Sequence, residues 1–343
     1  SLGEGRVLLD FGRTITGRLR CRFTMRDARN TQLRLRHFDV LPRPNDLDQT
    51  DYWFARSVGG WKNAGVSVHW APLFHLRCFR YVEVDYEGIE ESDPAPRFEA
   101  ESIGNLPARS AAFACSEPLL NSIHDAGART LEALTVFGVV TDCAHREKDG
   151  WGAEGEANLN LAWSHYRAAD FYRRFLKDCR DAQFEDGRIP YLIPYRRPMD
   201  SICAGGPYYM GHPLKIAWYG YLHTGDVTFL HDNYELGLGL LRFLASHCEE
   251  GILSVFPFGV GEPEHGSEPR SPMFYLGDWL APGAKWQPYP ENQLFNTAYL
   301  VSAARLMRKI NRITAGPAAD DAWLQDRIRE WSTAVVERFV DEE

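Results

Sequence analysis

Residues 142–154 hold the densest set of side chains capable of chemistry in this sequence. Four carboxylates, an arginine and a tryptophan share thirteen positions: Asp142, Arg146, Glu147, Asp149, Trp151 and Glu154. Cleaving a glycosidic bond requires a carboxylic acid that protonates the leaving oxygen, together with polar and aromatic groups that hold the sugar. A loop of mixed charge is also typical of a solvated surface, where ion pairs contribute little. The residue types alone therefore leave both interpretations open.

The elements that must position this stretch differ on its two sides. Up to about residue 103 apolar and polar residues alternate, as at Leu19, Cys21 and Phe23, which is typical of half-buried antiparallel strands. We therefore predict an antiparallel β-sandwich domain over residues 1–105, followed by an all-α domain over residues 106–343. Apolar residues at helical spacing predict helices near 116–131, 156–178, 212–222, 227–248, 294–311 and 319–340.

Composition narrows the class of protein. A chain of 343 residues suits two domains, and 44% hydrophobic and 25% charged residues are ordinary for a globular protein. The net charge of −9 gives no support for nucleic-acid binding, and no apolar run is long enough for a membrane span. Seven irregularly spaced cysteines predict reduced thiols and favour a cytoplasmic location.

No histidine spacing suggests a metal site, so we expect no metal and no cofactor. The oligomeric state stays open.

The order of the residues in 142–154 resembles the signature of the bacterial α-L-rhamnosidases, the inverting glycoside hydrolase family 78. That signature runs Asp-Cys-Pro-x-Arg-Glu-(Lys/Arg)-x-x-Trp-x-x-Asp, and the positions that match it in register are Asp142, Cys143, Arg146, Glu147, Lys148 and Trp151. Ala144 stands where the family has proline, and Glu154 where it has aspartate. Residues 9–13 and 79–84 resemble the β-sandwich domain of the same family. The resemblance implies an (α/α)6 helical toroid of twelve helices, of which we expect seven or eight here, so the ring should be incomplete in this chain.

The resemblance also implies roles for these side chains. Glu147 matches the proton donor, which must have a raised pKa so that it is protonated when the substrate arrives. Asp142 and Glu154 would accept hydrogen bonds from sugar hydroxyls, while Arg146 would orient one of the carboxylates. Trp151 would form an apolar wall, although a core tryptophan at the start of a helix is the plainer interpretation.

Other parts of the sequence match the family less evenly. Asp278 and Trp279 belong to a Gly-Asp-Trp-Leu-Ala-Pro segment that resembles another wall of the family's pocket, although Asp278 could instead cap a turn. The family's Trp-x-Asp-Ala motif is replaced by residues 205–212, which include Tyr208, Tyr209 and His212. Inversion needs a second carboxylate, and we find no match for it before Glu343. The nearest substitutes are Glu262, Glu264 and Glu268.

The sequence therefore predicts an inverting glycoside hydrolase that releases terminal α-L-rhamnose or a related sugar, with a carbohydrate as its partner. Two alternatives remain. One is an α/α-toroid glycosidase of different specificity, or a lyase in which Tyr208, Tyr209 or His212 serves as the base against a uronate. The other is a carbohydrate-binding relative that has lost catalysis.

Overall fold

The computed structural model describes residues 5–26, 30–41, 49–55, 65–91, 95–146, 148–194, 206–253 and 291–340. Its contacts divide the chain into two compact units. The sheet unit contains residues 1–106, 114–137 and 141–148, and the helical unit contains residues 107–113, 138–140 and 149–343. The predicted order of a β domain followed by an α domain is confirmed. The bounds 1–105 and 106–343 stay a prediction.

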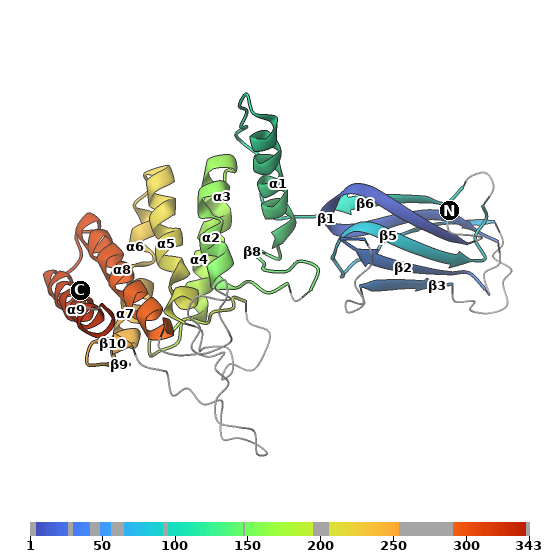
Figure 1. Cartoon of the computed structure of the whole chain (residues 1–343). Coiled ribbons are helices and arrows are strands. Elements are labelled where there is room, and N and C mark those ends of the chain that lie inside the picture. The colour runs from blue at the N-terminus through green and yellow to red at the C-terminus, as the bar shows by residue number, and fades with distance from the viewer. Residues whose placement is uncertain are drawn as a thin grey trace, which may run out of the picture. The chain divides into compact units, whose positions relative to one another are not determined.

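The sheet unit contains one antiparallel sheet of six strands (Figure 1). Its strands are β1 (Arg6–Met25), β2 (Gln32–Phe38), β3 (Thr50–Phe54), β4 (Val66–Trp70), β5 (Arg77–Glu87) and β6 (Arg97–Ser102). The sheet order is β3-β2-β5-β1-β4, and β6 also pairs with β1. The helix α1 (Pro118–Leu134) belongs to the same unit.

The long strand β1 connects the sheet by pairing with three other strands along its length. Residues 6–17 of β1 pair with β5, residues 17–22 pair with β6, and residues 21–25 pair with β4. The alternation predicted for this strand is confirmed, because Leu19, Cys21 and Phe23 are buried in one cluster with apolar residues of all the other strands. The outward face carries cross-strand ion pairs such as Arg34 with Asp85.

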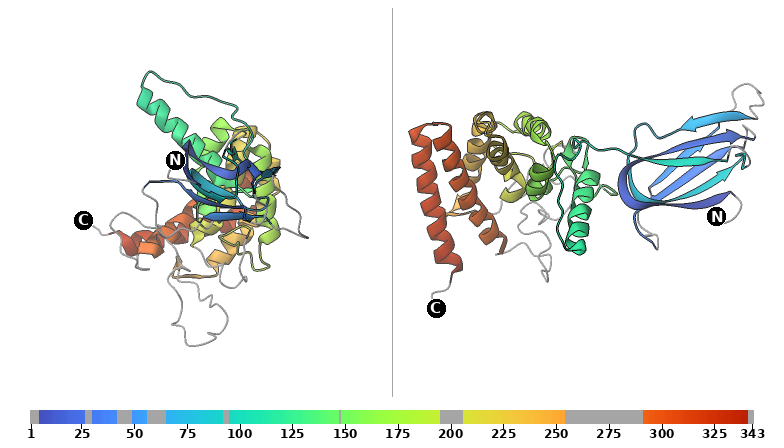
Figure 2. Two further views of the ribbon diagram at one scale, coloured as in Figure 1. Left: turned by 90° about the vertical axis from the view of Figure 1, so that its right-hand side faces the viewer. Right: turned by 90° about the horizontal axis from the view of Figure 1, so that it is seen from above.

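The helical unit is built on α5 (Pro207–Thr224), which contacts most of the other helices. The remaining helices of this unit are α2 (Gly152–Ala157), α3 (Leu159–His165), α4 (Ala169–Ala182), α6 (Thr228–His231), α7 (Tyr234–Ala245), α8 (Glu291–Ile313) and α9 (Ala318–Phe339). Short strands of this unit are β8 (Val139–Val140), β9 (Cys248–Glu249) and β10 (Ile252–Leu253), whereas β7 (Thr135–Val136) belongs to the sheet unit. The helices predicted near 294–311 and 319–340 are confirmed as α8 and α9, which lie side by side (Figure 2).

The single helix predicted over residues 156–178 is wrong, because α2, α3 and α4 replace it. The first break is at Asn158, whose side chain donates a hydrogen bond to the carbonyl of Glu154 at 2.8 Å and so competes with the helical pattern. The second is at Tyr166, which has extended backbone angles and forms an isolated bridge with Arg109. The helix predicted over 227–248 likewise divides into α6 and α7.

Candidate active site

The structure describes four of the seven predicted site residues. Glu147, Asp278 and Trp279 lie outside the described residues, as do Glu262, Glu264 and Glu268. Of the described four, Asp142 and Arg146 belong to the sheet unit, whereas Trp151 and Glu154 belong to the helical unit. The structure therefore divides residues 142–154 into two halves, each with its own supports.

The first half, of which residues 142–146 and 148 are described, contains a tight turn. The carbonyl of Cys143 accepts hydrogen bonds from the backbone N–H groups of Arg146 (2.9 Å) and Lys148 (3.2 Å). Ala144, which replaces the signature proline, is buried, while the Arg146 side chain is exposed and donates to the Cys143 sulfur at 3.2 Å. Asp142 is half-buried, and its Oδ1 has no hydrogen-bond partner among the described residues. A shielded carboxylate oxygen of this kind gains when a hydroxyl donor reaches it.

Lys148 connects this turn to the sheet unit through a hydrogen bond. Its backbone has a φ of 60°, in the left-handed region, and its Nζ donates to the carbonyl of Leu76 at 2.7 Å. Burial, with a smaller effect from Arg77, lowers the pKa of Lys148. Leu76 ends the connection between β4 and β5, so the residue that follows the predicted acid in sequence is held by a β-strand connection.

A buried carboxylate fixes the sheet next to this connection. Asp51 is 5% exposed and accepts from Arg77 Nη2 at 2.6 Å, and the same guanidinium donates to the Thr50 carbonyl at 3.1 Å. His37 lies 3.8 Å from Asp51, and burial lowers its pKa to about 4. Because Arg77 bonds both to the Asp51 carboxylate and to the Thr50 carbonyl, the start of β5 is tied to β3.

The second half, residues 149–154, is held by close packing. Trp151 forms a bridge with Leu192, stacks on Tyr191 at a centroid distance of 5.0 Å, and meets the edge of Tyr209 at 6.3 Å. Its Nε1 is buried with no hydrogen-bond partner in the described part of the chain. Most of the Trp151 ring is therefore packed as a core tryptophan would be.

Two glycines flank Trp151 where no side chain fits. A Cβ on Gly150 would lie 2.6 Å from the Ile193 carbonyl oxygen. A Cβ on Gly152 would overlap the His212 ring and the Tyr209 carbonyl. The glycines thus allow α2 to begin directly against α5.

On α2, two acidic residues take different directions. Each helical residue advances by about 100°, so Glu154 and Glu156 point to opposite sides of the helix. Glu154 is half-buried, whereas Glu156 is 8% exposed. Glu156 accepts from Lys215 of α5 and from Tyr299 of α8, and burial raises its pKa despite these donors. This cluster of Glu156, Lys215 and Tyr299 has no signal in the sequence, because Lys215 lies 59 positions from Glu156 and no motif connects them.

His212 proves to be a core residue. It is fully buried, its Nδ1 lies 2.9 Å from the Tyr209 carbonyl, and its Nε2 lies 3.8 Å from the Cys179 sulfur. Burial lowers its pKa to about 4, so it is neutral near pH 7. Its full burial gives no support to the prediction that His212 could serve as a lyase base, and that alternative stays a prediction. Tyr208 packs edge-on against Tyr299 and Phe295, and so belongs to the aromatic core between α5 and α8.

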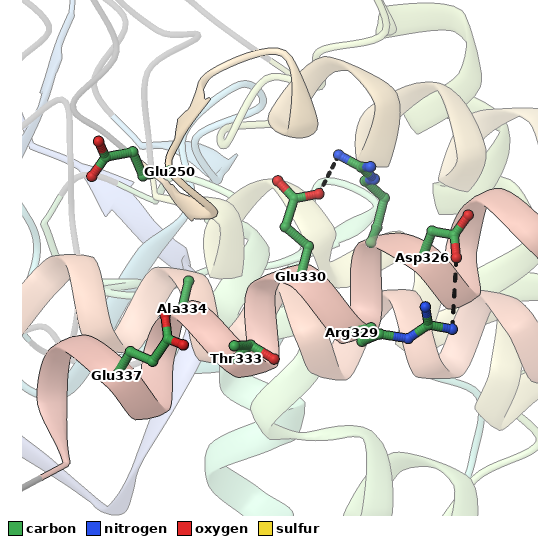
Figure 3. A pocket seen from close by; sticks show the side chains of 8 residues that line it. Glu250, Asp326, Arg329, Glu330, Thr333, Ala334 and Glu337 are labelled. Carbon is green, nitrogen blue, oxygen red and sulfur yellow. Dashed lines mark ion pairs between the residues drawn. The ribbon is translucent and has the colours of Figure 1, made fainter.

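One cavity among the described residues lies elsewhere, between the β9–β10 turn and α9 (Figure 3). Its volume is about 520 Å³, and its arginines, Arg327 and Arg329, pair with Glu330 and Asp326. It is lined by none of the predicted site residues, and its lining carries more carboxylates than arginines. Within the described ranges, no trio of metal-binding side chains gathers and no helix is suited to crossing a membrane.

A curled antiparallel sheet followed by helices packed in pairs is the architecture of a 6-hairpin glycosidase with an N-terminal β domain. Residues 108–343 match the bacterial alpha-L-rhamnosidase 6 hairpin glycosidase domain, and residues 1–103 match the bacterial alpha-L-rhamnosidase concanavalin-like domain. The chain belongs to the bacterial α-L-rhamnosidase family. This confirms the recognised family and the predicted fold class of a β domain followed by a helical toroid.

Proteins similar to this chain are named alpha-L-rhamnosidase. An alpha-L-rhamnosidase of Formosa agariphila is 23% identical over 73% of this chain and 27% of its own length. One of Streptomyces avermitilis is 26% identical over 97% of this chain and 30% of its own length. Among solved structures, the alpha-L-rhamnosidase from Dictyoglumus thermophilum has a TM-score of 0.80 at 23% identity, and covers 99% of this chain and 36% of that one. The Streptomyces avermitilis enzyme complexed with L-rhamnose has a TM-score of 0.75 at 24% identity, with coverage of 99% and 30%. The chain thus spans about a quarter to a third of these relatives.

Proposed function

We propose that the protein carrying this chain is an inverting glycoside hydrolase that releases terminal α-L-rhamnose, or a related sugar, from glycosides. The main support is that both parts of the chain match consecutive domains of one family, in the family's order. The relatives named alpha-L-rhamnosidase and the related structure with bound L-rhamnose support the choice of sugar.

Glu147 is proposed as the general acid that protonates the bridging oxygen as the bond to the leaving group breaks. Asp142 would hold a sugar hydroxyl, which agrees with an Oδ1 that is shielded from water and has no donor among the described residues. Arg146 is exposed to solvent and directly precedes Glu147 in the sequence, and it would orient one of these carboxylates.

The remaining proposed contacts shape the sugar pocket. Trp151 would present part of its ring to the sugar's methyl group, because the ring is only partly covered by Tyr191 and Tyr209. Glu154 would bind a hydroxyl from one methylene further out than the family's aspartate, which is why a related sugar stays in the proposal. Asp278 and Trp279 are proposed as a second wall from the resemblance alone.

In an inverting reaction water attacks the anomeric carbon from the face opposite the leaving group. A carboxylate about 6.5–9.5 Å from the acid takes the proton from that water. The attack and the departure occur in one displacement, so an α-glycoside yields a β-sugar. We assign no residue of this chain to the base.

The test uses the natural full-length protein and p-nitrophenyl α-L-rhamnopyranoside, with p-nitrophenyl α-L-arabinopyranoside and β-D-galactopyranoside as comparison sugars. We expect hydrolysis of the rhamnoside, and proton NMR during the first turnovers should show β-rhamnose before mutarotation. A folded protein that leaves the rhamnoside intact would refute the substrate class. Initial release of α-rhamnose would refute inversion while leaving the substrate class in place.

A further inference from the structure

The connection between β4 and β5, residues 71–76, presents two large apolar side chains to solvent. Leu73 is 76% exposed and Phe74 is 91% exposed, which makes Phe74 the most exposed of the large hydrophobic residues in the described chain. Single exposed hydrophobic residues are common, but an adjacent pair at the tip of one connection suggests a contact surface.

This connection is held at both ends. The Pro72 carbonyl accepts from Arg18 Nη1 at 3.3 Å, and Pro72 itself is buried. On the other side His75 lies 3.6 Å from the buried Asp51, and the Leu76 carbonyl accepts from Lys148 at 2.7 Å. The backbone on both sides of Leu73 and Phe74 is therefore fixed, and the two side chains are displayed by a supported turn.

The hydrogen bond from Lys148 joins this turn to the residue that follows the predicted acid in sequence. Lys148 directly follows Glu147 in the chain. Phe74 lies two residues from Leu76, so their Cα atoms are within roughly 7 Å of each other. A general acid must reach the oxygen between the sugar and the leaving group, so the aglycone begins on the acid's side of the bond. Side chains next to the acid's segment are therefore suited to meet the aglycone.

We propose that Leu73 and Phe74 bind the aglycone, and that the preferred aglycone is apolar and aromatic. This inference rests on the proposed function and narrows its substrate class. A flat aromatic leaving group gains by covering the Phe74 ring and the Leu73 methyl groups, because apolar surface leaves water and the rings can stack. A small polar aglycone gains nothing from these side chains.

The test measures aglycone selectivity in the natural full-length protein. Rates are compared for p-nitrophenyl α-L-rhamnopyranoside and methyl α-L-rhamnopyranoside, with rhamnose release as the common readout. In the Leu73→Ser/Phe74→Ser double variant, we expect kcat/KM for the aryl glycoside to fall about tenfold. The value for the methyl glycoside should stay within about twofold, so the ratio of the two reports binding of the aglycone and not general damage.

Phe54→Ser is the matched control. Phe54 is 57% exposed on the same sheet, and it lies at the level of Glu87, ten residues along β5 from Arg77 and roughly 33 Å away. This variant should leave the ratio unchanged. An unchanged ratio in the double variant would overturn the inference. The inference would also fail if the double variant lost thermal stability with the ratio intact, because another part of the protein would then cover Phe74. A wild-type protein that hydrolyses neither rhamnoside would refute the proposed function itself.

Discussion

The two halves of residues 142–154 are supported in different ways. In the first half, the described residues 142–146 and 148 are held by a few hydrogen bonds to backbone carbonyls, from Lys148 to Leu76 and from two N–H groups to Cys143. Residues 149–154 are held by packing so close that Gly150 and Gly152 leave no room for a Cβ. The comparison suggests that the first half can be adjusted by single polar substitutions without unfolding, whereas the second half is fixed by the packing of the helical unit.

The largest effect should come from Gly152→Ala. Its methyl group would overlap both the His212 ring and the Tyr209 carbonyl, so α2 must move away from α5. We expect the free energy of unfolding to fall by about 4 kcal/mol or more, measured by chemical denaturation. Gly155→Ala, three residues along α2, is the control, because its nearest neighbours would be ordinary contacts at 3.7 and 4.0 Å. It should be neutral or stabilising by up to about 1 kcal/mol. Equal losses in both variants would contradict the packing account.

An intermediate effect is expected from acid, through His212 in the helical unit. Its folded pKa is about 4, against an ordinary value near 6.5, because burial excludes the charged form. Below pH 6.5 the unfolded chain gains a proton that the folded chain does not, so stability is complete above pH 6.5 and falls as pH drops towards 4. The slope is about 1.4 kcal/mol per pH unit, which makes a loss of about 2 kcal/mol at pH 5.

His212→Asn should remove that share of the pH dependence when denaturation at pH 7 and pH 5 is followed by helical circular dichroism. His37→Asn is the counterpart in the sheet unit, where burial also lowers the pKa to about 4. It should change the acid sensitivity of the sheet and not that of the helices. If the helical transition of His212→Asn loses as much stability as the wild type between the two pH values, the titration of His212 does not govern it.

The smallest effect on folding, and a selective one on rate, should come from Lys148→Met in the first half. The variant keeps the apolar stem but loses the donor to the Leu76 carbonyl. If that bond positions the acid's segment, kcat should fall about tenfold, equivalent to about 1.4 kcal/mol, with KM nearly unchanged. Lys148→Arg, which can still donate, should recover most of the rate. A loss of thermal stability without a change in kcat would make Lys148 purely structural.

The sequence predicted those features that depend on local patterns. Alternation along β1 located the sheet core at Leu19, Cys21 and Phe23, and apolar spacing located α8 and α9. The interruption of the helix after Ala157 was missed, because the apolar spacing continues across Asn158 while its side chain bonds to the backbone.

The residues assigned to the candidate site stay predictions, and the same physical reason limits what the sequence can indicate there. The signature points to residues 142–154 because its information is carried by neighbours in sequence. It could not indicate that Lys148 would bond to Leu76, 72 positions away, or that Glu156 would pair with Lys215. Contacts between distant positions depend on the folded topology. The cytoplasmic location and the roles of Asp278 and Trp279 stay predictions.

The most direct test of the account is the rate of Glu147→Gln on p-nitrophenyl α-L-rhamnopyranoside in the full-length protein, beside Asp149→Asn. Glutamine has nearly the same shape but cannot supply the proton, so kcat should fall about 10²–10⁴-fold while the protein stays folded. Asp149→Asn removes a carboxylate two positions away and should retain most of the activity. A Glu147→Gln variant that keeps wild-type kcat would contradict the assignment of the acid, and with it the mechanism proposed for residues 142–154.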